Sequence, residues 1–280
     1  MTPQPTSSVG ASQSHVESPL SPVARFVATR WELAALRRAL PVIRREHVGG
    51  LRCLVGQSAE RAYWLIQTGV GPEAAQAAAS LVLDRQPMAL AISAGFAGAL
   101  TPAAIGDLIV GTSVSSAVYD GAWKQAGDPV SCPSAVVSCA QAVAAQLGIA
   151  VRIGPVVSVS KVVCRAEEKQ SLGRATGATA VDMESMALAR VARERAVPFM
   201  VLRTVSDLAG EDLPLDFNLF LRPSGWLRKM LNLIGHPSSL IGLNRLRRQS
   251  NLAAERLTAV CALYAGRGFG LSPAAERGRT

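Results

Sequence analysis

Residues Tyr63–Gly98 read YWLIQTGVGPEAAQAAASLVLDRQPMALAISAGFAG, and they hold the clearest strand and helix signals of the chain. An apolar run (Tyr63–Thr68) ends in glycines, a helical pattern follows (Pro72–Asp84), and a second apolar run (Ala89–Ala94) again ends in glycine. Short apolar runs bounded by turn residues are typical of strands buried on both faces of a sheet. The segment therefore predicts a strand–helix–strand unit.

The same alternation continues on both sides of this segment. It predicts an α/β fold: a single domain with a mixed, largely parallel central sheet flanked by helices. The other predicted strands lie near Ala24–Ala28, Leu51–Val55, Asp107–Ser113, Gly154–Ser158 and Phe199–Val205. The other predicted helices are Arg30–Leu40, Pro133–Leu147, Ala166–Ala175, Met183–Arg195 and a final helix from about Asn244 to Tyr264.

Length and composition fit one domain with terminal extensions. The chain has 280 residues, of which 49% are hydrophobic and 18% are charged. We expect a domain over 23–265, with a disordered leader over 1–22, rich in Ser, Pro, Gln and Thr, and a flexible tail over 266–280. The leader lacks the features of a signal peptide and the apolar runs are too short to cross a membrane, so we expect a cytoplasmic protein.

The net charge of +9 first suggests a nucleic-acid partner, but its distribution argues against one. Ten basic and two acidic residues lie between Leu221 and Thr280, which leaves 19 basic and 18 acidic residues in the first 220. The excess is therefore local to the C-terminal part, and we expect no nucleic-acid binding.

Cysteine and histidine give little material for a metal or redox site. The five cysteines form no CxxC pair, and the three histidines are scattered, so neither a disulfide framework nor a zinc site is indicated. Three glycine-bearing strand ends, Thr68–Gly71, Ser93–Gly98 and Ile105–Asp107, would let a ligand approach the backbone closely. They lack Rossmann or Walker spacing, so no nucleotide cofactor is expected.

Carboxylates give the sharper signal for chemistry. Asp182 and Glu184 stand at a predicted helix start, where such residues can simply cap free N–H groups. Asp207 ends a hydrophobic strand, a position where α/β enzymes present an acid or base, although a cap or turn residue is an alternative interpretation. Glu32, on an arginine-rich helix, would on its own be interpreted as a solvated charge.

With these motifs the chain resembles the purine nucleoside phosphorylase superfamily, and most closely the methylthioadenosine/S-adenosylhomocysteine nucleosidases. The resemblance covers roughly Val23–Phe217 and Asn244–Tyr264. Its motifs, in the family's order, are Ala28–Leu33, Thr68–Gly71, Ser93–Leu100 followed by Gly106 and Asp107, Asp182–Glu184, and Val197–Phe199 running into Val205–Asp207.

The resemblance implies an enzyme that breaks an N-glycosidic bond and works as a homo-oligomer, a dimer or a higher assembly. No cofactor and no metal are expected. Asp207 would protonate N7 of the departing purine and Glu32 would polarise the attacking water, which requires that Asp207 keep a proton through burial. The implied substrate-binding residues are Glu184 for the ribose hydroxyls and, around the base and nucleophile, Met183, Ser206, Val162, Val163, Gly95 and Phe96.

Ser93 favours hydrolysis over phosphorolysis. The phosphorylases of the superfamily commonly place an arginine at this strand position to bind phosphate, and this chain has serine. Arg30 or Arg203 remains available for an anion, so a phosphorylase is the alternative. Two departures from the nucleosidase pattern, Phe96 and Asp182, weaken any transfer of substrate identity.

An insertion at Leu221–Leu243 suggests an apolar substrate. Its apolar residues Trp226, Leu227, Met230, Leu231 and Ile234 would share one helical face, with basic neighbours, as in a helix lying at a lipid interface. We expect hydrolysis of an adenine nucleoside with an apolar 5′ group, such as the adenosyl lipid adenosylhopane of hopanoid biosynthesis, and a peripheral contact with the inner face of the membrane. Alternatives are an ordinary packed or dimer-contact helix and a non-catalytic nucleoside-binding or membrane-surface protein.

Overall fold

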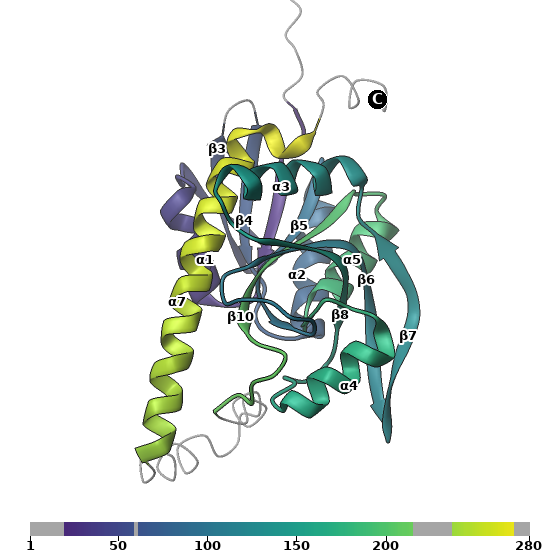
Figure 1. The fold of residues 1–280 in the computed structure, drawn as a ribbon. Helices are drawn as coiled ribbons and strands as arrows, with labels where there is room; N and C mark the ends of the chain where they lie inside the picture. Colours follow the sequence, from purple (N-terminus) through teal and green to yellow (C-terminus); the bar gives the residue numbers. More distant parts are fainter. Residues whose placement is uncertain (1–19, 59–60, 215–236, 272–280) are drawn as a thin grey trace, which may run out of the picture.

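A mixed β-sheet forms the centre of the molecule in the computed structural model, which describes residues 20–58, 61–214 and 237–271 (Figure 1). The described residues contribute ten strands: β1 (Val23–Val27), β2 (Arg44–Val48), β3 (Leu51–Ser58), β4 (Arg61–Gln67), β5 (Leu90–Ala99), β6 (Leu108–Asp120), β7 (Ala122–Ser131), β8 (Val151–Ser158), β9 (Ala180–Asp182) and β10 (Phe199–Asp207).

The order of the strands brings the ends of β5 and β10 together. The sheet runs β10-β6-β8-β9-β5-β1-β4-β3-β2, β7 pairs with β6, and β10 also pairs with β5. Strands β4, β1, β5 and β10 are parallel neighbours, while the hairpins β2–β3, β3–β4 and β6–β7 are antiparallel. Because β5 and β10 run in parallel, their carboxyl ends meet at one edge, where ligands bind in open α/β sheets.

Helices cover the sheet on both sides. They are α1 (Arg30–Ala39), α2 (Pro72–Arg85), α3 (Ser134–Gln146), α4 (Ala166–Thr176), α5 (Ser185–Glu194), α7 (Pro237–Gly266) and the short 3-10 helix η2 (Gly268–Gly270). Helix α7 packs against α1, α3 and β10, whereas α2 packs against α5. Helix α4 lies beside β7, below the carboxyl ends of the central strands in the view of Figure 1.

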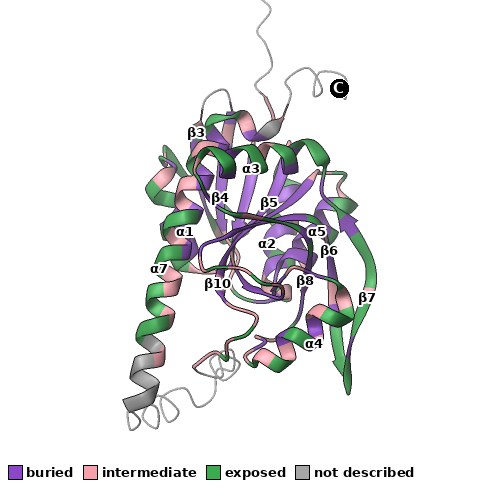
Figure 2. Ribbon diagram, viewed as in Figure 1, coloured by how far each residue is buried: buried purple, intermediate pink, exposed green. Residues whose placement is uncertain are grey.

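Burial explains why the central strands read as continuous apolar runs. All five residues of β1 are buried, and nine of the ten residues of β5 are buried, because helices cover both faces (Figure 2). The predicted α/β class with a mixed central sheet is confirmed, and the seven predicted strands and six predicted helices are all present.

Three strands escaped the sequence analysis. Strands β2 and β7 are mostly exposed and polar, so they carry no apolar run, and β9 is only three residues long. The prediction for the last helix was wrong at its start, because α7 begins at Pro237 rather than at Asn244. The Pro, Ser and Gly residues at 237–242 disfavour a helix on propensity alone.

Several predictions concern residues outside the described part. They are most of the leader, most of the tail, and the insertion up to residue 236 with its apolar stripe; the remaining residues of the insertion, 237–243, belong to α7. In the part of the chain that the structure describes, no helix is both long and apolar enough to cross a membrane.

Candidate active site

Two glycines of β5 make room for acidic side chains. A Cβ atom on Gly95 would overlap the Glu32 carboxylate and lie 2.5 Å from Nη1 of Arg203. A Cβ on Gly98 would lie 2.9 Å from Oδ1 of Asp207. Three residues of a strand span roughly 10 Å, so the two glycines mark two neighbouring positions along β5, named below the Gly95 position and the Gly98 position. The sequence Ser93–Gly98 is therefore the floor of the site.

Arg203 lies at the Gly95 position and is surrounded by carboxylates. Its side chain is buried, with Nη2 2.9 Å from Asp182 Oδ2, Nη2 3.8 Å from Glu184 Oε2 and Nη1 3.8 Å from Glu32 Oε1. Burial by itself lowers the pKa of this guanidinium, but the three carboxylates, Asp182 foremost, outweigh burial and raise the pKa above its ordinary value. Arg203 is therefore a fixed cation that gathers the acidic residues.

Ser93 belongs to the same buried group. Its hydroxyl accepts a hydrogen bond from Arg203 Nη2 at 2.7 Å and one from Ser185 Oγ at 2.8 Å. The two terminal nitrogens of Arg203, which the sequence analysis kept as a possible anion receptor, are therefore already engaged by protein partners, and its Nε has no hydrogen-bond partner among the described residues. Arg30, the other candidate, is exposed at the start of α1.

Glu32 is buried, so its interpretation as a solvated charge is wrong. It completes a capping box at the start of α1, where its Oε2 accepts from the Thr29 N–H at 2.8 Å and from the Thr29 hydroxyl at 3.0 Å. Its Oε1 accepts from the Phe96 N–H at 2.8 Å. The helix cap thus holds one oxygen of this carboxylate over β5.

Glu184 faces the glycine turn that precedes α2. The Gly71 N–H donates to Glu184 Oε1 at 2.9 Å, and Gly69 and Gly71 both have φ near +90°, which favours glycine. Burial raises the pKa of Glu184 to about 7; Arg203 and the Gly71 N–H oppose the rise, and Asp182 and Glu32 add to it. This carboxyl group is therefore poised to change charge near neutral pH.

Asp182 has the structural role that its position suggested. It ends β9, and its Oδ1 accepts from the Ser185 N–H at 3.2 Å at the start of α5 and from the Ser158 hydroxyl at 2.5 Å. Its Oδ2 accepts from the Ser185 hydroxyl and pairs with Arg203. Asp182 therefore caps the helix and fixes Arg203.

Asp207, at the end of β10, lies at the Gly98 position. The β5–β10 register shifts between Val205 and Asp207, and such a bulge re-aims a side chain at a strand end. Asp207 is 9% exposed, and its Oδ2 lies 3.0 Å from the Ser206 hydroxyl, which also lies 3.3 Å from the carbonyl oxygen of Ala97. On its other side, Oδ1 accepts a hydrogen bond from the buried ammonium of Lys169.

A cavity of about 70 Å³ opens beside Asp207. It brings together the acid, Met183 and the two valines expected around a base. Its lining residues are Gly98, Lys161, Val162, Val163, Val181, Asp182, Met183, Asp207 and Leu213. The wall is thus apolar on the valine side and acidic on the β10 side.

Phe96 does not line this cavity. Its N–H holds Glu32, but its side chain borders a separate pocket of about 310 Å³ between α1 and α7. That pocket is lined by Arg30, Trp31, Ala34, Ala35, Arg38, Phe96, Ser250, Asn251 and Ala254. Neither Asp207 nor Glu184 reaches it.

Two lysines of the site escaped the sequence analysis. Lys161 lies at the cavity with its ammonium 5.2 Å from the centre of the Tyr119 ring and 5.5 Å from that of Trp123. Lys169 stands in a run of charged residues that reads as a solvated helix face. The one signal for its burial is its spacing of three from Leu172, the other buried residue of α4.

Comparison with known proteins finds one matching protein family and several similar nucleosidases. The family model described as the phosphorylase superfamily matches residues 22–222. The 5′-methylthioadenosine/S-adenosylhomocysteine nucleosidase of Shewanella denitrificans is 26% identical over 205 residues, which cover 69% of this chain and 89% of that protein. The corresponding nucleosidase of Shewanella baltica is 26% identical over 206 residues, 70% of this chain and 87% of the relative.

Solved structures share the fold at lower identity. The 5′-methylthioadenosine/S-adenosylhomocysteine nucleosidase of Neisseria meningitidis, in complex with methylthio-immucillin-A, has a TM-score of 0.68 at 20% identity and covers 87% of this chain and 100% of that one. The futalosine hydrolase of Helicobacter pylori has a TM-score of 0.66 at 19% identity, with 86% and 97% covered.

Proposed function

Because this chain belongs to the phosphorylase superfamily, we propose that it hydrolyses the N-glycosidic bond of a purine nucleoside, with Asp207 as the acid that protonates the leaving base. One observation carries the proposal: the buried Glu32 carboxylate lies against Gly95 of β5, and Asp207, which lines the cavity, lies against Gly98 of the same strand. Breaking this bond builds positive charge on the sugar and negative charge on the base. The carboxylate at the Gly95 position would stabilise the sugar, and the acid at the Gly98 position would neutralise the base.

The proton transfers balance in a simple way. Asp207 gives its proton to N7 of the base while the electrons of the C1′–N9 bond pass to the purine. Water bonds to C1′ and gives a proton to Glu32, whose carboxylate is held over β5. Solvent then takes the proton from Glu32 and returns one to Asp207, so the net reaction adds one water molecule.

The remaining side chains bind the substrate. Glu184, beside Met183, accepts hydrogen bonds from the ribose hydroxyls in its ionised form. Val162 and Val163 contact the base from the apolar wall of the cavity. Ser206 orients Asp207 through its hydrogen bond to Oδ2.

Hydrolysis is favoured over phosphorolysis by the partners of Arg203. A phosphate site needs an arginine that is free to form a bidentate contact. Arg203 instead donates to Ser93 and pairs with Asp182, and Ser93 stands where the phosphorylases commonly carry the phosphate arginine.

Adenine is the purine that we propose, with an apolar 5′ group. The curated relatives are named as nucleosidases of 5′-methylthioadenosine and S-adenosylhomocysteine, which are both 5′-substituted adenosines. The finer proposal, an adenosyl lipid approached by a dimeric enzyme at the membrane surface, is supported by the apolar and basic composition of the insertion at Leu221–Leu243.

A substrate panel tests the proposal. Purified protein is incubated in phosphate-free buffer with 5′-methylthioadenosine, inosine, a futalosine-type nucleoside and an adenosyl lipid, and both products are identified. We expect free adenine and the free sugar from adenine nucleosides, fastest with apolar 5′ groups. Cleavage only when phosphate is added would instead assign a phosphorylase, and no base release from any nucleoside would leave a binding protein.

A further inference from the structure

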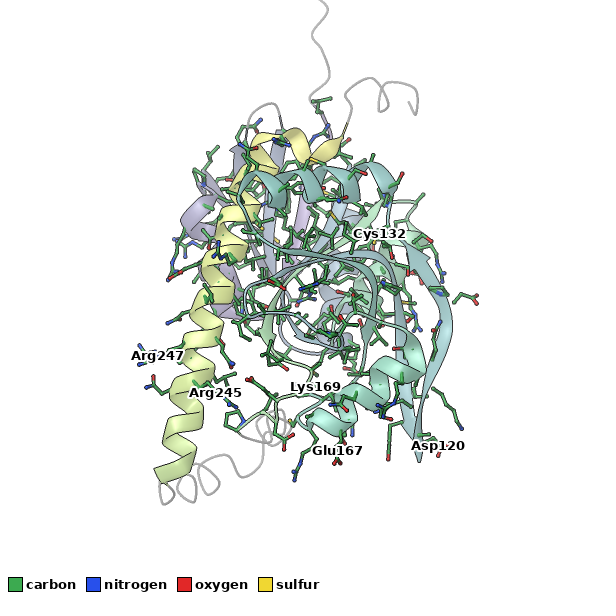
Figure 3. The ribbon with its side chains drawn as sticks, viewed as in Figure 1. Asp120, Cys132, Glu167, Lys169, Arg245 and Arg247 are labelled. Carbon is green, nitrogen blue, oxygen red and sulfur yellow. The ribbon has the colours of Figure 1, made fainter. Side chains whose placement is uncertain are left out.

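Lys169 is buried to 0% exposure on a helix that is otherwise largely polar. It lies on the side of α4 that faces the end of β10, whereas Glu167 on the same helix points away from the body (Figure 3). Lysine almost always keeps its ammonium in water, and burying one costs several kcal/mol unless a charge partner compensates. Its position therefore requires a partner.

The ammonium of Lys169 has a full set of acceptors. It donates to Asp207 Oδ1, to the carbonyl oxygen of Leu208 at 3.0 Å and to that of Glu211 at 3.2 Å. A lysine has three N–H donors, so all three are committed to the end of β10 and to the turn that follows. This arrangement leaves the ammonium no freedom to rotate away from Asp207.

The same turn is joined to the start of α4 by other bonds. The Ala166 N–H donates to Asp212 Oδ1 at 2.8 Å, and the Leu213 N–H donates to the carbonyl oxygen of Cys164 at 2.8 Å. The residues just before α4 include the two valines of the cavity. Lys169 thus connects the wall that carries the acid to the wall that faces the base.

We propose that Lys169 is the positioning residue of the acid: it orients the Asp207 carboxyl group and stabilises the carboxylate that remains when the proton moves to the base. This inference rests on the proposed function. In that step the O–H electrons stay on Asp207, and a negative charge appears in contact with a fixed ammonium. An opposite charge at this distance stabilises a carboxylate, whereas burial alone destabilises it.

Few other charged groups face Asp207. Asp182 and Lys161 share its cavity, but Asp182 is paired with Arg203, and Lys161 lies over aromatic rings and 3.7 Å from Glu168. Among the described residues, Lys169 is therefore the ammonium in direct contact with the acid. Removing its charge should therefore slow the transfer of the proton from Asp207 to the base and change the pH range over which the rate falls.

The test is the pH dependence of base release by Lys169→Gln and Lys169→Arg. Glutamine keeps hydrogen-bond donors without the charge, and arginine keeps the charge. For Lys169→Gln we expect kcat to fall by at least about tenfold with little change in KM. We expect the falling limb of its pH–rate profile to move up by about one unit or more. Lys169→Arg should restore the limb to its wild-type position.

A matched control separates this effect from a general loss of lysine. Lys124 is exposed and pairs with Asp120 at the tip of the β6–β7 hairpin, so Lys124→Gln should leave both rate and profile unchanged. If Lys169→Gln and wild type share the same falling limb, the inference is overturned while the proposed function stands. If the wild type releases no base from any nucleoside, both fall together.

Discussion

Gly98 stands opposite Asp207 in the β5–β10 ladder, so close that a Cβ atom on the glycine would lie 2.9 Å from the aspartate oxygen. A contact this short forces the neighbour to move, and here the neighbour is the proposed acid. The glycine is thus part of the site because it has no side chain.

Gly98→Ala tests this relationship. The added methyl group should push the Asp207 carboxyl group out of line with the base and lower kcat by about 10- to 100-fold. Gly266→Ala is the control, because no atom lies within 4 Å of a Cβ built there. A Gly98→Ala enzyme with wild-type kcat would show that Asp207 does not need this space.

The raised pKa of Glu184 predicts a rising limb in the pH profile of base release. In the proposed function Glu184 binds the ribose hydroxyls as a carboxylate, and its pKa is raised to about 7, chiefly by burial. We expect kcat/KM, which reports the free enzyme, to rise with pH through about 7, at pH values below the falling limb. Glu184→Gln should lower kcat/KM and abolish this limb. A limb that persists in Glu184→Gln would have to belong to another group.

The same group predicts how stability depends on pH. Its pKa is about 7 in the folded protein and 4.5 ordinarily, so between these values the folded chain binds more protons than the unfolded chain. The contribution of Glu184 to stability therefore falls as pH rises through this window, by about 3 kcal/mol at most. Glu184→Gln should gain stability relative to wild type at pH 8 but not at pH 4.

Urea unfolding at the two pH values checks this prediction, with Glu255→Gln as the control because Glu255 is exposed on α7. A Glu184→Gln variant with the same stability difference at both pH values would contradict the raised pKa.

Two fully buried arginines should respond oppositely to the same substitution. Arg25 in β1 lies 4.6 Å from the centre of the Phe269 ring and 5.6 Å from that of Tyr63, but none of its three nitrogens has a hydrogen-bond partner in the described part of the chain. Burial accordingly lowers the pKa of Arg25. Arg203, by contrast, holds three carboxylates.

Arg25→Met should therefore leave the free energy of unfolding unchanged or raise it by about 1–3 kcal/mol, because it removes an unpaired buried charge. Arg203→Met should lower it by about 3–5 kcal/mol, because it leaves buried carboxylates without their cation. Chemical denaturation of both variants measures the difference. Equal destabilisation would mean that Arg25 has a partner of comparable worth.

The fold class could be predicted from the sequence because both faces of the central strands are covered by helices. The apolar runs of β1, β5 and β10 follow directly from that burial. The exposed strands β2 and β7 follow no such rule, since their residues face water and their pairing depends on neighbours distant in sequence.

The proposed acid was also visible in the sequence, but its partner was not. Asp207 follows a strand whose pattern locates its end, whereas Lys169 lies 38 residues away among charged neighbours on another element. The burial of Glu32 was equally hidden, since its helix is polar and only the packing of α1 on β5 encloses it. The burial of Lys169 and Glu32 depends on contacts between elements that are distant in sequence.

The central claim, hydrolysis with Asp207 as the acid, is tested most directly by one labelling experiment. Wild type and Asp207→Asn are incubated with 5′-methylthioadenosine, and with an adenine nucleoside carrying a longer apolar 5′ group, in heavy-oxygen water without phosphate. We predict equal amounts of adenine and of sugar bearing one heavy oxygen at C1′, and a rate about 10²- to 10⁴-fold lower for Asp207→Asn. Unlabelled sugar, or wild-type adenine release by Asp207→Asn, would contradict the account.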